Sequence, residues 1–421
     1  MEILLNSGST LVIIAAVVGL FMAWGIGAND VANAMGTSVG SKALTIKQAI
    51  IIAMVFEFAG AYLAGGEVTS TIRKGIIDAS FFVDSPELLV FGMISALFAA
   101  ATWLLIASAL GWPVSTTHSI VGAIVGFAAM GVSVDAVTWS KVGGIVGSWI
   151  ITPLISGVIA FIIFNSAQKL IFDTEKPLQQ AKRWVPFYMF LAGFVLALVT
   201  IKKGLKHLNL HIDNVDGYIY AIVTAVIVAV IGKLFINRIK FDESAALKTH
   251  YANVEKVFAI LMIVTACAMA FAHGSNDVAN AIGPLAAVVS IVDNGGQIAA
   301  KSAIAWWILP LGGFGIVAGL AIFGHKVIAT IGSGITHLTP SRGFAAELAA
   351  ACTVVISSGA GLPISTTQTL VGAVLGVGMA RGIAAINLSV VRNIVVSWVI
   401  TLPVGAGLSI IFFWMMKGIF A

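Results

Sequence analysis

The chain has 421 residues, of which 59% are hydrophobic and 10% charged, and its mean hydropathy is +1.04. A soluble globular domain carries roughly 25% charged residues, so this composition excludes one and indicates a polytopic membrane protein in a lipid bilayer. The net charge of +5 comes from Lys and Arg in loops that flank the apolar segments. We therefore interpret it as a topology signal and predict no nucleic-acid partner.

Apolar segments recur along the whole chain at the ~20-residue length that spans a bilayer. Residues 1–10 contain Glu2 and no Lys or Arg, so we expect the first segment to be a retained helix and not a cleaved signal. We expect about twelve segments, although 187–201 is short for a span, and 114–132 and 363–381 are equally compatible with re-entrant hairpins. The segments are 9–26, 43–66, 88–110, 114–132, 141–164, 187–201, 217–236, 256–273, 299–323, 343–358, 363–381 and 389–416.

The basic residues of three loops predict the orientation. Loops 165–186 and 233–256 carry nine Lys and Arg together, against three in loop 202–216. The positive-inside rule places the richer loops in the cytoplasm, and counting back through the earlier segments places the N-terminus outside. We expect a multi-pass protein of the cell (inner or plasma) membrane. The residues counted are Lys169, Lys176, Lys182, Arg183, Lys233, Arg238, Lys240, Lys248 and Lys256, against Lys202, Lys203 and Lys206.

Three motifs of the first half return in the same order in the second half, at offsets between 247 and 250 residues. We therefore divide the chain into a first repeat 1–165, a two-helix insert 166–255 with cytoplasmic loops, and a second repeat 256–421. Five segments of the first repeat and two of the insert precede the second repeat. Because seven crossings is an odd number, the second copy enters the membrane from the opposite side, and the copies are antiparallel, as in secondary transporters with inverted repeats. A different interpretation of one hairpin alone would break this parity. The motifs are Gly-Ala-Asn-Asp-Val-Ala-Asn-Ala at 27–34 and Gly-Ser-Asn-Asp-Val-Ala-Asn-Ala at 274–281, Pro-x-Ser-Thr-Thr at 113–117 and 363–367, and Ser-Trp-x-Ile-Thr at 148–152 and 397–401.

The repeated Asn-Asp motif predicts a cation site. On a helix its acid and amides share one face, and their oxygens are hard ligands suited to small hard cations such as sodium. Glycines and Pro284 near the motifs lower helix propensity, so we expect broken helices there. The alternative is that these groups hydrogen-bond for helix association, which the doubled acid in apolar surroundings disfavours. The candidate sodium ligands are Asn29, Asp30, Asn33, Asn276, Asp277 and Asn280.

The repeated Ser-Thr-Thr motif predicts an anion site. Each copy follows a proline and leads into an apolar stretch that is typical of a helix beginning at the hydroxyls. Free backbone N–H groups and a positive dipole end would then bind an oxyanion such as phosphate. The alternative is plain N-capping, which the duplication disfavours. The candidate residues are Ser115, Thr116, Thr117, Ser365, Thr366 and Thr367.

The two sites constrain each other through their charges. Two like charges at ~4 Å repel by several kcal/mol at an effective dielectric of ~20, so a dianion near Asp30 and Asp277 requires cations or protons. Inward movement of a dianion against an interior-negative potential costs a further ~4.6 kcal/mol at ~100 mV. Co-transport of at least two cations removes that penalty, and we predict sodium ions in this role.

At these motifs the chain resembles the inorganic phosphate transporter (PiT) family, whose duplicated signature stands at 27–34 and 274–281. Gly-Thr-Ser-Val-Gly-Ser at 36–41 and Thr-Ile-Arg-Lys-Gly-Ile at 71–76 match as well. The resemblance covers both halves. It implies about twelve spans, inverted repeats, symport of phosphate with sodium or protons at the two pairs of motifs, and a homodimer.

The resemblance also identifies two candidate coupling residues. Glu57 and Glu347 match intramembrane glutamates that the family uses in transport. Glu347 has no repeat mate, because Leu97 stands at the corresponding position, and this weakens any symmetric role for it.

We predict a secondary active transporter that imports inorganic phosphate by symport with sodium ions through alternating access. The alternatives are a proton-coupled phosphate or metal-phosphate symporter, a sulfate permease, and a passive anion channel, which would show non-saturating flux. We predict no enzyme, because the apolar segments contain no His/Glu metal cluster and no activated nucleophile with its base.

Overall fold

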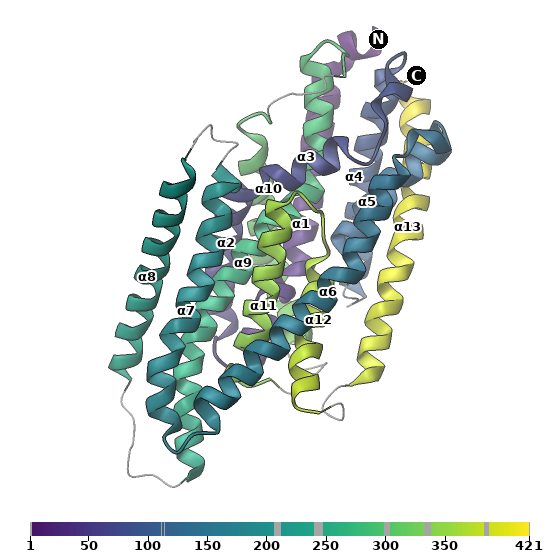
Figure 1. The fold of residues 1–421 in the computed structure, drawn as a ribbon. Helices are drawn as coiled ribbons and strands as arrows, with labels where there is room; N and C mark the ends of the chain where they lie inside the picture. The colour runs from purple at the N-terminus through teal and green to yellow at the C-terminus, as the bar shows by residue number, and fades with distance from the viewer. Residues whose placement is uncertain are drawn as a thin grey trace.

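The computed structural model describes residues 2–110, 112, 114–205, 212–239, 247–298, 304–331, 338–382 and 387–420. In these residues the chain forms thirteen α-helices, three short 3₁₀ or π turns and no β-strand, which confirms the all-α class. In Figure 1, α7 and α8 lie at one edge of the bundle and α4, α5 and α13 at the other, with both termini at the same end. Pro113 of the first Ser-Thr-Thr motif, and the loop residues Lys206 and Lys240, lie outside the described residues.

The first predicted repeat contains six helices, and its two longest helices are α1 and α6. Two 3₁₀ turns join helices within it, and a π turn follows its last helix. The elements are α1 (Glu2–Gly40), α2 (Ile46–Ala64), α3 (Gly66–Lys74), η1 (Ala79–Phe82), α4 (Pro86–Ala109), α5 (Thr116–Gly131), η2 (Val134–Ala136), α6 (Trp139–Ala167) and η3 (Gln168–Phe172).

Among the described residues, the predicted insert contains the helices α7 and α8, and the second predicted repeat contains α9 to α13. The insert helix α7 packs on α9 and on α11, and α8 packs on α7. The elements are α7 (Pro177–Lys202), α8 (Asn214–Arg238), α9 (Leu247–Asp293), α10 (Ile308–Ile331), α11 (Pro340–Gly359), α12 (Thr366–Ala380) and α13 (Leu388–Phe420).

Nine of the described helices are long and apolar enough to cross a membrane, whereas the sequence predicted about twelve segments. The helices at two predicted segments, α5 and α12, have only 16 and 15 residues. At 1.5 Å per residue these helices are shorter than the ~30 Å hydrocarbon core. They pair instead with α4 and α11 as helical hairpins, which favours the hairpin alternative. The short segment 187–201 is part of α7, which has 26 residues.

The expectation of broken helices at the Asn-Asp motifs is wrong. Helix α1 runs without interruption for 39 residues and α9 for 47, and each motif lies inside its helix. A continuous helix satisfies the backbone N–H and C=O groups of a buried segment internally. The motif glycines Gly27 and Gly274 do not interrupt the helices but allow another helix to approach closely.

These glycines lie at two matching helix crossings. A Cβ at Gly27 would stand 1.9 Å from the carbonyl oxygen of Ile316 on α10, and a Cβ at Gly274 would stand 2.1 Å from that of Glu57 on α2. Each partner helix contributes a glycine in return. A Cβ at Gly319 would lie 1.9 Å from the carbonyl oxygen of Trp24, and one at Gly60 would lie 2.0 Å from that of Phe271. The backbones of α1 and α10, and those of α2 and α9, are therefore in direct contact.

A second pair of matching contacts joins the short helices to the other half. Helix α5 packs on α13, and α12 packs on α6. A Cβ at Gly126 would lie 2.6 Å from Cα of Ala406, and one at Gly376 would lie 2.0 Å from the carbonyl oxygen of Gly157. Each half thus contributes one short helix to a long helix of the other half, and the two halves hold each other together.

Gly319 provides a test of the crossings. We expect Gly319→Ala to lower the melting temperature of the purified protein clearly, because its Cβ overlaps the Trp24 carbonyl and overpacking costs about 1–3 kcal/mol. Gly147→Ala on α6 is the control, since a Cβ there meets no atom within 4 Å and alanine favours a helix. Equal melting temperatures for both variants would contradict the close crossing.

Candidate functional site

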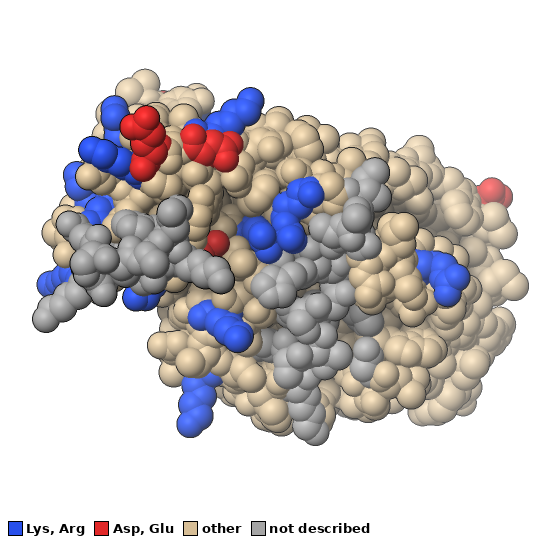
Figure 2. Space-filling model, turned by 90° about the horizontal axis from the view of Figure 1, so that it is seen from below, with Lys and Arg blue, Asp and Glu red and all other residues tan. Residues whose placement is uncertain are grey.

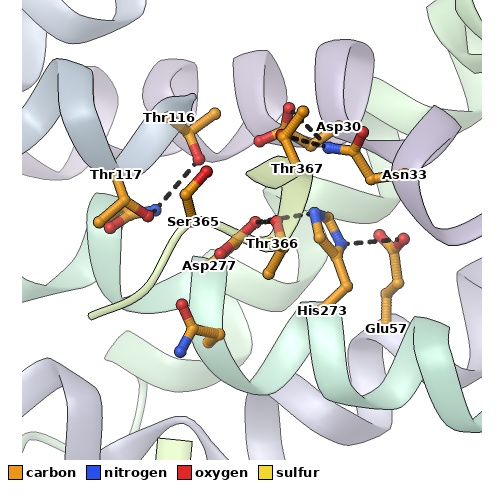
Figure 3. Close-up of polar contacts among 12 residues, drawn as sticks. Asp30, Asn33, Glu57, Thr116, Thr117, His273, Asp277, Ser365, Thr366 and Thr367 are labelled. Carbon is orange, nitrogen blue, oxygen red and sulfur yellow. Dashed lines mark hydrogen bonds and ion pairs between the residues drawn. The ribbon is translucent and has the colours of Figure 1, made fainter. Parts of the chain in front are cut away.

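The two Asn-Asp motifs meet in the middle of the bundle. Helices α1 and α9 run in opposite directions, since Gly8 faces Val292 and Gly19 faces Leu285. All residues of both motifs are buried. The carboxylates of Asp30 and Asp277 and a ring nitrogen of His273 offer three ligand atoms that lie within 4.8 Å of one another. The structure therefore brings the two repeated acids together (Figure 3).

The threonines at the starts of α5 and α12 contact these motifs. The hydroxyl of Thr366 donates a hydrogen bond to Asp277 Oδ2 at 2.8 Å, and Asn33 Nδ2 donates to Thr367 Oγ1 at 2.7 Å. In the matching arrangement, Asn280 Nδ2 lies 3.2 Å from Thr116 Oγ1 and 3.1 Å from Thr117 Oγ1. The predicted acid, amide and hydroxyl groups thus form one buried polar centre (Figure 3).

Ser115 and Ser365 are N-caps, as the alternative interpretation proposed. The oxygen of Ser115 accepts a hydrogen bond from the backbone N–H of His118, and that of Ser365 accepts one from the N–H of Gln368, both at 3.3 Å. Capping orients the first turns of α5 and α12, whose positive ends then face the polar centre.

Asn29 and Asn276 have a different environment from the other motif amides. Asn29 Nδ2 donates to Ser108 Oγ on α4, and Asn276 Nδ2 donates to Ser358 Oγ on α11, both at 2.8 Å. These two bonds tie each motif to the helix that precedes its short helix. The amide nitrogens thus have a structural role, and only the amide oxygens remain available as ligands.

Several buried acceptors at the centre receive no hydrogen bond from the described part of the chain. They are Asp30 Oδ2, Asn276 Oδ1, Asp277 Oδ1 and Asn280 Oδ1. A buried acceptor without a donor costs about 1–3 kcal/mol, and a bound cation removes that cost. Carboxylate and amide oxygens form the hard donor set that fits a sodium ion, so the residues present suit the predicted cation.

His273 is the residue at this centre that the sequence prediction missed. Its Nε2 lies 2.9 Å from Asp277 Oδ2 and its Nδ1 lies 3.1 Å from Glu57 Oε1. All three side chains are fully buried. The signal was present, because His273 stands one turn before Asp277, where the first repeat has Ile26. Glu57 therefore contacts the centre through His273.

Glu347 occupies a separate buried cluster of hydroxyl groups. Thr37 and Ser38 on α1 both donate to Oε1, with Ser38 at 2.6 Å. Thr265 on α9 donates to Oε2 at 2.8 Å. Leu97, Pro284, Leu285 and Val18 stand at the corresponding repeat positions, so this cluster has no counterpart in the other half.

Comparison with known proteins gives consistent matches over the whole length. The family model described as "Phosphate transporter family" matches residues 26–409. A relative from Haemophilus influenzae named as a phosphate permease is 59% identical over 423 residues and covers 100% of both chains. "Inorganic phosphate transporter 2-1, chloroplastic" from Arabidopsis thaliana is 45% identical over 95% of this chain and 71% of its own. A solved structure named "The sodium-dependent phosphate transporter" is 41% identical, with a TM-score of 0.91 over 97% of this chain and 100% of that one.

Thr366 provides a test of the geometry at the centre. Thr366→Val keeps the shape of the side chain and removes the donor to the buried carboxylate of Asp277, so we expect a loss of about 1–3 kcal/mol in stability. The measurement is the melting temperature of the purified protein. Thr353→Val is the control, because the Thr353 hydroxyl donates to the Ala349 carbonyl of its own helix and not to a carboxylate. A drop no larger than that of the control would contradict the contact.

Proposed function

The chain belongs to the phosphate transporter family, and from this premise we propose that it imports inorganic phosphate by symport with sodium ions through alternating access. Membership establishes a multi-pass membrane transporter and not an enzyme. Sodium coupling is proposed from the donor set of the buried centre and from the similarity to a solved transporter that is named as sodium-dependent.

The observation that carries this proposal is the pair of buried aspartates with unpartnered oxygens beside the two short-helix ends. An anion held at the threonines lies near two like charges, and that arrangement is stable only when cations bind with it. We assign the cations to Asp30, Asn33, Asp277 and Asn280, with the oxygens of Asn29 and Asn276 as further ligands; of these six, Asp30, Asn276, Asp277 and Asn280 each have an unpartnered oxygen.

The phosphate is assigned to the starts of α5 and α12. Thr116, Thr117, Thr366 and Thr367 supply hydroxyls, and the N-caps Ser115 and Ser365 direct the backbone N–H groups of the first turns. These donors are neutral, so they bind an oxyanion without adding fixed positive charge. Sodium ions supply the charge, and we expect sodium to bind before phosphate or together with it.

Alternating access is supported by the relation between the two halves. The antiparallel α1 and α9, the two glycine crossings, and the exchanged short helices are what an inverted duplication produces. On this proposal the divisions 1–165, 166–255 and 256–421 are functional units, and the two repeats move relative to each other around the centre. The homodimer implied by the family resemblance stays a prediction.

The function is tested by phosphate uptake into sealed proteoliposomes. We expect an inward sodium gradient to drive saturable accumulation, and we expect Asp30→Asn and Asp277→Asn each to lower it at least tenfold, because each removes a charged ligand of the cation. Asp135→Asn is the control, since Asp135 is exposed. Uptake that persists when potassium replaces sodium, and that a proton gradient alone drives, would overturn sodium coupling.

The same vesicles separate the remaining alternatives. Sulfate competes with labelled phosphate in a sulfate permease and does not in a phosphate transporter. Uptake that requires a divalent metal ion identifies metal-phosphate symport. Flux that does not saturate, without accumulation against a gradient, identifies a channel.

The proposed orientation has the N-terminus outside. Figure 2 views the end of the bundle opposite both termini, where Lys and Arg side chains are spread over the surface and Asp and Glu are few. In a chain with both native cysteines replaced by serine, we expect Asn6→Cys to react with an impermeant maleimide in intact cells, and Glu175→Cys to react only after lysis. The opposite pattern would reverse the orientation.

A further inference from the structure

The two matching helix crossings differ in one respect, which is the polarity of the side chains beside the glycines. Where α2 crosses α9, Glu57 and His273 are in contact. Counting from the paired glycines, the corresponding positions where α1 crosses α10 hold Ile26 and Ile316. All four side chains are buried. One crossing therefore carries a polar pair, and its counterpart carries two isoleucines.

Packing alone gives no reason for the polar pair. The crossing of α1 and α10 shows that glycines and isoleucines are sufficient to pack such a contact. A buried carboxylate and imidazole carry a desolvation cost that well-packed apolar side chains avoid. Their presence on one side only points to a role at Asp277, the group that the imidazole contacts.

The contacts at Asp277 and Asp30 differ accordingly. Oδ2 of Asp277 receives the hydroxyl of Thr366 at 2.8 Å and faces Nε2 of His273 at 2.9 Å, while its Oδ1 has no hydrogen bond from the described chain. Asp30 receives the amide of Asn33, one turn along its own helix, at 3.2 Å, and a contact from the Thr116 hydroxyl, the counterpart of Thr366. Each acid thus contacts a threonine of a short helix, and Asp277 differs from Asp30 by the ion-pair contact of its Oδ2 with the imidazole.

We propose that His273, held by Glu57, is a positioning residue that makes the two cation positions of the centre unequal. It fixes the carboxylate of Asp277 so that Oδ1 faces the cation, whereas the cation position at Asp30 forms without such a partner. This inference rests on the proposed function, because it concerns the sodium ions that accompany phosphate.

The physical basis is preorganisation of a ligand. A carboxylate whose second oxygen is anchored loses less rotational freedom when its first oxygen binds an ion, and removal of such an outer partner typically weakens metal binding about 10–100-fold. Glu57 contributes by orienting the ring, in the way that a carboxylate behind a histidine fixes a metal ligand. We therefore expect sodium at Asp277 to depend on both residues more strongly than sodium at Asp30.

The test compares His273→Gln with His273→Leu in the full chain. Glutamine retains an N–H donor that reaches toward Asp277, and leucine retains only bulk. We expect His273→Leu to raise the sodium concentration for half-maximal phosphate uptake at least tenfold, to lower the steepness of the sodium curve, and to leave the KM for phosphate at saturating sodium within twofold of wild type. His273→Gln should recover most of the sodium affinity. Ile26→Leu, at the matching crossing, is the control and should leave the sodium curve unchanged.

A second readout does not depend on transport. Sodium stabilises the purified protein in proportion to its affinity, so we expect the sodium-induced rise in melting temperature to be smaller in His273→Leu than in wild type. Glu57→Gln still accepts from the ring, and it should perturb this rise less than Glu57→Leu. The comparison of each variant with and without sodium separates a change in binding from a change in folding.

Each outcome decides one claim. A wild-type protein that takes up no phosphate in response to sodium overturns the proposed function. A wild-type protein that does so, with the same sodium curve in His273→Leu, overturns the positioning role. The third outcome is that His273→Leu raises the phosphate KM as much as the sodium concentration for half-maximal uptake, and lowers the melting temperature in sodium-free buffer. This outcome shows that His273 only supports the fold, and it also overturns the positioning role.

Discussion

Two buried acids at close range are the constraint on which the rest of this structure depends. Asp30 and Asp277 offer carboxylate oxygens within 4.8 Å of one another. Two unit charges at that distance repel by about 3 kcal/mol at an effective dielectric of 20, and burial adds to the cost. Hydrogen-bond donors from the short helices, such as Thr366 at Asp277, offset part of this free-energy cost. The carboxylate and amide oxygens that remain without a donor favour a cation. A bound cation would in turn reduce the repulsion between the two acids and an anion.

The repeated motifs explain how one chain builds such a centre. Each half supplies an acid and an amide on a long helix, with threonines at the start of a short helix, and the contacts Asn33–Thr367 and Asn280–Thr117 cross between the halves. Neither half is complete alone. The backbone contacts at Gly27 and Gly274 hold the long helices against rigid partners, so the ligands sit on regular helices and not on loops.

The duplication is also broken where the chemistry requires it. The Glu57–His273 pair and the hydroxyl cluster of Glu347 each occur once. The corresponding positions of the other repeat hold apolar residues. A perfectly symmetric centre would give both sides the same affinity for their ions. Two different polar additions distinguish the sides: His273 contacts the Asp277 oxygen that Thr366 of α12 also contacts, and the Glu347 cluster lies among hydroxyls of α1 and α9.

The sequence by itself determined the membrane class, the duplicated motifs and the family, because composition and repetition are properties of the chain read in order. It also identified the acids and threonines that meet, since their motifs recur. Only the tertiary structure decided that α1 and α9 are continuous, because their glycines serve a crossing that no local pattern reveals. It alone paired His273 with Glu57, 216 residues away, because burial and contact between distant segments arise only when the helices pack.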